Sequence, residues 1–383
     1  MRRIDMNTSR AALAAVLVLG TLLGTTACAG GAPSPAATAE PGVTDPVTSP
    51  TAEPEGPQPI LDLSCEELLA TVTVAATMPS SVVPAVMALA ELGGSRGGIP
   101  TSTYVRSLGG LACEWNNGEP YNSSAGSNPD YLGIRVLVLP DAVSQWERFE
   151  TYYSGTDALG LYCAGLIEPL YCTHEELVGT NWVSAEIIGA GNAPAAEAIA
   201  NEVLTAVSVA GPGGPAWMPP ADTIPLSANC EDTLPVTPVG LLLGVGVPLV
   251  AQGPDGGWSL GAGARENTGA ALCIYTFEMS MAGVGSIESL PAGEWAWREM
   301  RPLITSPAVP ERVEIALLGD GDEAWVRCSA DGHSCYLDLV VGGNWVQLQV
   351  WDIEGESEAA SVTVDPRAGI LRLGEAVLGE LRG

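Results

Sequence analysis

Cysteine is the residue type in this chain with the most definite chemistry, and its nine copies fall into three sets. One of them, Cys28, stands alone near the start of the chain. The other eight form two groups of four, namely Cys65, Cys113, Cys163 and Cys172, followed by Cys230, Cys273, Cys328 and Cys335. Eight cysteines can pair as disulfides in an oxidising compartment, which leaves Cys28 for a different chemistry.

The residues before Cys28 have the order of an export signal. Arg2, Arg3 and Arg10 give the chain a positive start. Residues 11–24 then form an apolar run, which is shorter than the ~20 residues that a helix needs to cross a bilayer. A charged start followed by a short apolar run is typical of a secretory signal peptide, here residues 1–27.

Residues 25–30, Thr-Thr-Ala-Cys-Ala-Gly, resemble a bacterial lipobox, in which the cysteine receives a diacylglyceryl group and becomes the mature N-terminus. We expect Cys28 to be this lipid attachment site, with palmitate among the acyl chains. Thr25 departs from the pattern, which usually has leucine there. The alternative is plain secretion with cleavage after Ala29, because Ala27-Cys28-Ala29 fits the A-x-A rule.

Two histidines lie beside the short cysteine loops, His174 after Cys172 and His333 before Cys335. Their positions do not match, so we expect both to be exposed loop residues rather than parts of a shared site. Cys328, His333 and Cys335 could bind zinc on paper, but cysteines outside the cell should oxidise first. We therefore expect neither a metal nor a cofactor.

Acidic residues offer two weaker possibilities. Residues 320–323, Asp-Gly-Asp-Glu, could bind a hard cation, but they lack the other ligands of a calcium loop and are more typical of an acidic turn before a strand. Carboxylates are so numerous in this chain that no pair of them identifies hydrolytic chemistry. The sequence contains no G-x-S-x-G, H-E-x-x-H or Walker motif, and it predicts no catalytic residue.

Tryptophan, with ten copies against two phenylalanines, is the remaining residue type that could bind a ligand. Five tryptophans lie at matching positions of two similar segments or on apolar faces and are expected in the core: Trp115, Trp146, Trp182, Trp297 and Trp345. Three have no counterpart and are the candidates for stacking on a sugar or wall fragment: Trp217, Trp258 and Trp351.

These residues belong to two similar halves of the chain. The four cysteines of the first half match those of the second at offsets of about 160–165 residues. Apolar landmarks keep the same order, so that residues 178–183 (VGTNWV) match residues 341–346 (VGGNWV). The alternative, two unrelated domains, would have to produce this shared order by chance.

Periodicity within each half predicts a mixture of helices and strands. Ser64 and Glu67 form a capping box that opens a helix. Residues 131–139 are expected to form a strand, after which Asp141 should cap the next helix. Two hairpins are expected, over residues 177–189 and 336–353.

Each half is expected to end in a helix, which Asn192 caps in the first half and Asp365 in the second, each with a proline just inside. The order helix, strands, helix, hairpin, helix predicts an α+β fold. We expect two tandem copies of a domain in which helices cover an antiparallel sheet.

Shifts in composition predict the domain organisation. Residues 28–59 are the lipidated cysteine and a disordered tether of Pro, Ala and Thr, with too few apolar side chains to fold. Repeat domain 1 is expected over residues 60–210, a Pro/Gly-rich linker over 211–225, and repeat domain 2 over 226–383.

Four cysteines in each half allow three disulfide pairings. We predict Cys65–Cys113 and Cys163–Cys172 in the first half, and Cys230–Cys273 and Cys328–Cys335 in the second. The short loops should flank a strand pair, so bridging them needs little rearrangement. The long bridges should tie the first helix of each half to the first strand that carries a cysteine.

The overall charge excludes one class of partner. The formal net charge is −30 with a pI near 4.1, and all 15 basic residues are arginines. A protein this acidic should be repelled by nucleic acids and by anionic surfaces. We therefore expect no nucleic-acid partner.

Several short motifs carry a resemblance to a known group of proteins. Cys65 opens a helix before Leu68-Leu69, Cys113-x-Trp115 lies on a strand, and residues 321–325 (GDEAW) precede a hairpin. This pattern resembles the actinobacterial cell-envelope lipoproteins of unknown function. Similar extracellular domains occur as sensor modules, some with PsbP-like α+β folds. The resemblance implies an envelope protein without known chemistry and supplies no catalytic residue.

Together these features predict an exported, non-enzymatic protein that is lipid-anchored at the outer face of the cell membrane. Its role should be binding, sensor-like or accessory. The expected partners are the membrane, through the lipid, and an unknown envelope protein or small ligand. The alternative is a wall-active or ester hydrolase that uses acidic residues. A pocket with a carboxyl of shifted pKa would favour the enzyme, and an aromatic cleft between the two halves would favour binding.

Overall fold

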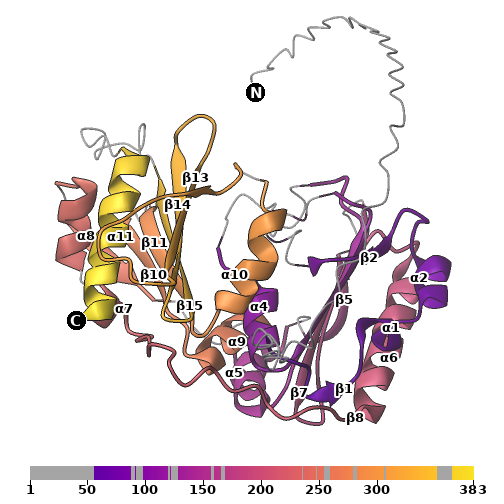
Figure 1. Ribbon diagram of the computed structural model, residues 1–383. Coiled ribbons are helices and arrows are strands. Elements are labelled where there is room, and N and C mark those ends of the chain that lie inside the picture. The colour runs from indigo at the N-terminus through magenta and orange to yellow at the C-terminus, as the bar shows by residue number, and fades with distance from the viewer. Residues whose placement is uncertain are drawn as a thin grey trace, which may run out of the picture. The chain divides into compact units, whose positions relative to one another are not determined.

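Two antiparallel sheets, each with helices packed against it, make up most of the described chain (Figure 1). The computed structural model describes residues 56–87, 91, 98–119, 121, 128–156, 159–164, 169–234, 236–246, 248–253, 259–278, 283–305, 308–351 and 365–383. These residues belong to one compact unit, Glu53–Gly383. The predicted signal peptide, Cys28, most of the tether and Trp258 lie outside the described residues.

The first sheet has six strands in the order β2-β3-β4-β7-β6-β5. Their bounds are β2 Val83–Ala85, β3 Leu111–Asn116, β4 Gly133–Leu139, β5 Gly160–Ala164, β6 Tyr171–Val178 and β7 Asn181–Ile188. The strand predicted over residues 131–139 is confirmed as β4. The hairpin predicted over residues 177–189 is confirmed as the β6–β7 pair, although its first strand begins earlier, at Tyr171. A further short pair, β1 (Leu61–Asp62) with β8 (Gly211–Pro212), forms a separate two-stranded sheet.

The second sheet has seven strands in the order β12-β13-β14-β15-β11-β10-β9. Their bounds are β9 Leu249–Gln252, β10 Leu272–Phe277, β11 Gly283–Leu290, β12 Glu311–Arg312, β13 Glu323–Cys328, β14 Ser334–Val341 and β15 Asn344–Trp351. The predicted hairpin over residues 336–353 is confirmed as β14 and β15, which turn at residues 342–343.

Strand order is the same in both sheets. Read from its other edge, the second sheet runs β9-β10-β11-β15-β14-β13, with β12 added at the end, and each strand takes the place of one in the first sheet. The register also agrees, since Cys113 lies opposite Val136 on β4 and Cys273 lies opposite Ile287 on β11. Helices with purely antiparallel sheets make this an α+β fold, as the sequence predicts.

Helices cover one face of each sheet. On the first sheet these are α1 (Cys65–Leu68), α2 (Thr71–Thr77) and α6 (Ala193–Val209). On the second they are α7 (Cys230–Thr233), α8 (Val236–Leu243) and α11 (Pro366–Arg382). The predicted caps are confirmed, because Ser64 and Glu67 form a reciprocal capping box and the Asn192 and Asp365 side chains accept the backbone N–H groups of Ala195 and Ala368.

The expected cap at Asp141 is wrong. The helix that follows β4, α5 (Val143–Tyr153), has Ala142 as its N-cap and no side-chain cap bond. Asp141 lies in the left-handed region with φ 50°, and its carboxylate accepts a 3.5 Å hydrogen bond from the Thr180 hydroxyl of the β6–β7 turn. The aspartate is therefore engaged by the neighbouring turn and not by the helix.

Four helices lie on the opposite faces of the two sheets: α4 (Thr101–Ser107), α5, α9 (Leu260–Thr268) and α10 (Glu294–Met300). They share one apolar core, in which α4 packs against α9 and the buried rings of Trp182 and Trp345 take part. Helix α10 is followed by a short 3₁₀ segment, Arg301–Leu303. Residues from both halves therefore contribute to a common core.

Disulfides join the same four cysteine pairs that the spacing predicts, namely Cys65–Cys113, Cys163–Cys172, Cys230–Cys273 and Cys328–Cys335. Disulfides persist in oxidising compartments, so they indicate a location outside the cytoplasm. In the described part of the chain, every helix is too short or too polar to cross a bilayer.

Candidate binding cavity

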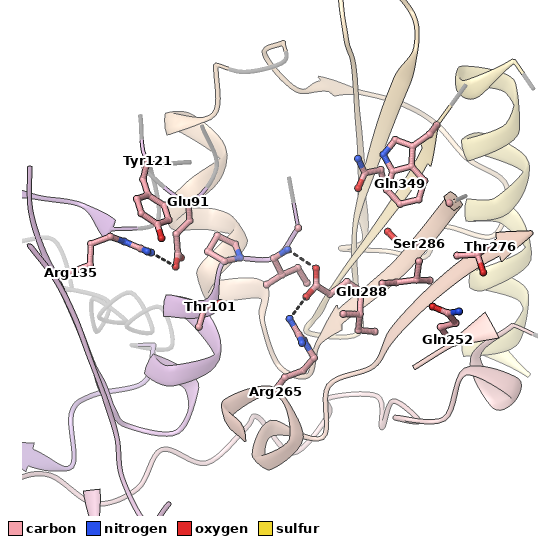
Figure 2. A pocket seen from close by; sticks show the side chains of 17 residues that line it. Glu91, Thr101, Tyr121, Arg135, Gln252, Arg265, Thr276, Ser286, Glu288 and Gln349 are labelled. Atoms are coloured by element: carbon pink, nitrogen blue, oxygen red, sulfur yellow. Dashed lines mark hydrogen bonds and ion pairs between the residues drawn. The ribbon is translucent and has the colours of Figure 1, made fainter. Parts of the chain in front are cut away.

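A cavity of about 800 Å³ is lined by residues of both halves (Figure 2). One wall carries Arg135 of β4 with Tyr121 and Glu91, and the opposite wall is formed by the second sheet. Between them, residues 98–101 lead into α4, next to Arg265 of α9. This volume is in the ~300–1,000 Å³ range of small-molecule sites.

The wall formed by the second sheet combines uncharged polar side chains with apolar ones, and Glu288 lies at its base. Gln252, Ile274, Ser286 and Gln349 lie side by side on the adjacent strands β9, β10, β11 and β15. Trp351, two residues beyond Gln349, lines the same cavity. Because side chains alternate along a strand, all of these residues share the face opposite α8 and α11.

Thr276 is the most unusual member of this wall. It lies on β10, two residues beyond Ile274, and is only 4% exposed. Its hydroxyl has no hydrogen-bond partner among the described residues. Since buried hydroxyls are nearly always satisfied, an unsatisfied hydroxyl on a residue that lines the cavity is unusual.

The wall formed by the first half carries a cluster of charges around Arg135. The Arg135 guanidinium lies 2.6 Å from Glu91, 2.6 Å from Glu186 and 3.7 Å from Glu114. It also lies over the ring of Tyr121, 3.8 Å from the centroid. These contacts hold the buried arginine in place, and the carboxylates raise its pKa further above its ordinary value despite burial.

Glu114 lies behind this wall and is almost fully buried. Burial raises its pKa to about 7, while Arg135 and hydrogen bonds from Asn116 and Tyr131 act in the opposite direction. The amide of Asn116 donates at 2.6 Å and the hydroxyl of Tyr131 at 2.8 Å. Glu114 is not among the residues that line the cavity, so the carboxyl with the raised pKa is not presented to a molecule in the cavity.

Glu288 of β11 connects the two halves at the base of the cavity. One of its oxygens accepts hydrogen bonds from the Tyr104 hydroxyl at 2.8 Å and from Arg265 at 3.1 Å. The other accepts the backbone N–H of Ile99 at 2.9 Å. A carboxylate of the second half is thus bonded to two groups of the first.

Both carboxylates on the cavity wall are fully engaged within the protein. Glu288 has donors on both oxygens, as just described. Glu91 accepts Arg135 on one oxygen and both the backbone N–H and the hydroxyl of Ser102 on the other. Neither side chain is therefore presented as an unoccupied base or nucleophile for hydrolysis.

Corresponding strands of the two sheets carry different residues at the centre of this face. Glu114, Arg135 and Glu186 lie side by side on β3, β4 and β7. At the same places on β10, β11 and β15, the second sheet has Ile274, Ser286 and Gln349. The side chains of the first row fill that face of the first sheet with an ionic network. Those of the second row are shorter and uncharged, and they leave the cavity open.

The structure brings one of the three predicted tryptophan candidates to the cavity. Trp351 is half-buried and lines it. Trp217 is half-buried in the segment between the halves and is not part of the lining. Trp258 lies outside the described residues. The tryptophans predicted for the core are buried, except that Trp146 is only partly so.

The two histidines differ from each other. His333 is exposed in a turn, as expected, but the expectation for His174 is wrong. His174 lies on β6 and is 7% exposed, because the strand already begins at Tyr171 and the alternation turns His174 to the same face as buried Cys172. Its Nε2 atom lies 3.0 Å from a Glu176 oxygen.

The possible cation sites are occupied by other interactions. Cys328 and Cys335 form a disulfide, and residues 320–321 form a turn before β13. Asp322 accepts the backbone N–H of Gly319 at 2.9 Å and is paired with Arg382. Among the described residues, no cluster of His, Cys, Asp and Glu could hold a metal ion.

Arg135, Ser286 and Gln349 were not predicted as site residues from the sequence. A signal was present, since Arg135 interrupts the apolar strand GIRVLVL at residues 133–139 and a charge inside such a strand needs partners. The partners lie on other strands and in a distant turn, however, and spacing alone does not identify them.

Comparisons with protein-family models, with curated proteins and with solved structures find no significant match to this chain.

Proposed function

We propose that this chain is an exported, lipid-anchored binding protein of the cell envelope, without enzymatic activity, that holds a small ligand in the cavity between its halves. The observation that carries the proposal is the composition of the cavity wall. Polar uncharged groups and Trp351 face the cavity, while the charged groups around it already pair with one another. Such a lining suits recognition of a ligand better than chemical attack on it.

The hydrolase alternative has weaker support. A pair of acidic groups would need one carboxylate free to activate water or attack the substrate. Glu91 and Glu288 have donors on both oxygens, and Glu114, whose pKa is near 7, lies behind Arg135. These contacts favour binding.

We further propose that the two halves are divergent tandem copies of one domain, over residues 60–210 and 226–383. Shared strand order, matched disulfides and matched register support this history. In this account one copy filled its sheet face with the Arg135 network, and the other kept a face open for a ligand.

The proposed location of the protein is the outer face of the cell membrane. Cys28 would carry the lipid, and the tether over residues 28–59 would hold the folded unit off the outer face of the membrane. The four disulfides support an exported protein. An envelope protein that senses the bound state would be the natural partner for a sensor-like or accessory role.

The test uses the full-length lipidated protein, purified in detergent and incubated with small molecules extracted from its own envelope fraction. After desalting, the protein is denatured and the released compounds are identified by mass spectrometry. A double variant, Ser286→Arg with Gln349→Glu, rebuilds the ionic row of the first sheet inside the cavity. Val72→Arg, at a position that is 75% exposed, is the matched control.

We expect wild type and the Val72→Arg control to retain a compound that the double variant does not retain. If all three proteins release the same compounds, or none at all, the cavity does not hold a ligand and the proposed function is wrong.

A further inference from the structure

We infer that the ligand of this cavity is an uncharged, polyhydroxylated molecule of the size of a mono- or disaccharide. The inference rests on the proposed binding function and names the ligand class for the same site. It follows from the charge balance, from the polar groups and from the aromatic ring that the cavity presents.

The charged side chains that line the cavity balance one another. The two arginines on the wall, Arg135 and Arg265, are paired with the two carboxylates, Glu91 and Glu288. Glu186 and Glu114 add negative charge beside Arg135, so the sum of these charges disfavours an anionic ligand. The Nε–H groups of Arg135 and Arg265 have no acceptor among the described residues, and a neutral oxygen suffices to accept them. A cationic ligand would need a carboxylate oxygen without a donor, and both oxygens of Glu91 and Glu288 already accept hydrogen bonds. A neutral ligand disturbs none of these pairs.

The wall formed by the second sheet also carries hydrogen-bonding groups. Gln252, Ser286 and Gln349 line the cavity with amide and hydroxyl groups. The Gln349 amide already donates to the Tyr336 hydroxyl at 2.7 Å, so its carbonyl oxygen is the group that it offers to a ligand. Adjacent strands lie ~4.8 Å apart, so a single hydroxylated ring can reach groups on two strands at once. A sugar hydroxyl can both donate and accept, and it would also satisfy the buried Thr276 hydroxyl.

Trp351 adds an aromatic ring to this wall of the cavity. Its ring lies against β11 at Gly283, where a methyl group on the glycine would lie only 3.2 Å from the ring. The glycine thus lets the indole approach the sheet closely beside the polar row. The C–H face of a sugar ring packs against an indole, while its hydroxyls reach the neighbouring amides.

The matching face of the first sheet can be compared with this site, because it carries other residues at the same positions. In the first sheet the place of Ser286 is taken by Arg135, and the place of Gln349 by Glu186. The long guanidinium and its carboxylates occupy the room that a ligand would need. Only the second sheet has the short neutral row that leaves this room open.

Binding is measured by calorimetry and tryptophan fluorescence on the full-length lipidated protein, in a detergent without a sugar headgroup. The neutral probes are glucose, N-acetylglucosamine, maltose and chitobiose. Choline is the cationic comparator and gluconate is the anionic one, which has similar hydroxyls but a carboxylate. We expect at least one neutral sugar to bind and both comparators to fail.

Three variants test the geometry. Trp351→Ala should weaken sugar binding by ~10-fold or more, and the near-isosteric Thr276→Val should weaken it by several-fold, while the melting temperature of each stays close to that of wild type. Gly283→Ala should displace the indole and weaken binding as Trp351→Ala does, although it removes no group that touches the ligand.

Failure of this inference can be told from failure of the proposed function. If no sugar binds, or if sugar binding is the same in all three variants, the ligand class is wrong. Should the protein still retain an envelope compound that the Ser286→Arg, Gln349→Glu double variant loses, the binding function stands with a different ligand. Absence of both results contradicts both proposals.

Discussion

Two carboxylates occupy matching places in the two sheets, Glu175 partly buried and Asp338 fully buried, and they differ in their partners. Glu175 accepts the indole N–H of Trp182 at 2.6 Å, and Asp338 accepts that of Trp345 at 3.0 Å. Asp338 also pairs with the fully buried Arg327 at 3.4 Å. Among the described residues no such cation pairs with Glu175, and burial raises its pKa from 4.5 to about 8.

Replacement of Glu175 by Gln should flatten the dependence of stability on pH. A carboxyl whose folded pKa is raised stabilises the fold fully below its unfolded pKa, and this contribution is lost as the pH rises towards the folded value. Wild type should therefore lose on the order of a few kcal/mol between about pH 4.5 and 8. Glu175→Gln should lose less, because a glutamine imitates the protonated acid.

Chemical denaturation at pH 5 and pH 8 measures this difference. A smaller slope should remain in the variant, because burial also raises the pKa of Glu114. An unchanged slope in Glu175→Gln would show that Glu175 is ionised in the folded protein at both pH values.

The matching substitution in the second sheet, Asp338→Asn, should behave differently. It removes the carboxylate that faces Arg327, so the buried guanidinium loses this partner at a cost of ~3–5 kcal/mol. Urea denaturation at pH 7 should show this loss in Asp338→Asn and little or none in Glu175→Gln. Equal losses in the two variants would contradict the assigned difference between the two sites.

At the scale of elements, the disulfides connect helices and strands that pack together. Cys65 of α1 is joined to Cys113 of β3 over a separation of 48 residues, whereas Cys163 and Cys172 join two neighbouring strands over 9. The chain-entropy model gives a larger stabilisation for the longer loop.

Removal of the long bridge, by Cys65→Ala with Cys113→Ala, should cost ~4 kcal/mol in the free energy of unfolding. Removal of the short bridge, by Cys163→Ala with Cys172→Ala, should cost ~2.5 kcal/mol. Equilibrium urea unfolding of the two double variants gives the comparison. A larger loss for the short bridge would mean that native packing, and not loop closure, sets the contribution.

Local elements were predictable wherever neighbouring residues determine them. Ser64 and Glu67 lie one turn apart and cap each other, and residues 178–183 contain their own turn. Asp141 and His174 were predicted wrongly, because the first is engaged by the distant Thr180 and the second depends on where a strand begins. Both outcomes are set by contacts beyond a few residues in sequence.

The cavity was less predictable than the elements that form it. Alternation on β4 and β11 places Arg135 and Ser286 on a defined face of each sheet. Their opposition across one cavity depends on the packing of α4 against α9, which spacing does not specify. Trp351 was a candidate because it has no counterpart in the other half, and its place near Gly283 became clear only from the strand pairing.

At the scale of the whole molecule, the two halves are joined by a common core and by polar contacts. Tyr104 and Ile99 of the first half bond to Glu288 of the second, and Arg106 pairs with Glu299 at 2.8 Å. Both halves belong to the one compact unit Glu53–Gly383, so a ligand bound between the two sheets would contact both halves of that unit.

Membrane attachment is a separate prediction that involves only the start of the chain. Cys28→Ser removes the acceptor of the lipid and leaves the apolar signal intact. In the producing cell, the variant should move from the membrane fraction to the medium, as followed by immunoblotting. Unchanged retention of Cys28→Ser in the membrane fraction would contradict lipid anchoring at this residue.

A ligand in this cavity should contact both halves of the chain at once, and amide hydrogen exchange measured in both halves tests this. The full-length lipidated protein is measured with and without the small-molecule extract of its envelope fraction. The account predicts slower exchange in residues 98–107 of the first half together with residues 283–290 and 344–351 of the second. Slower exchange in one half alone, or in neither, would contradict a binding site built from both.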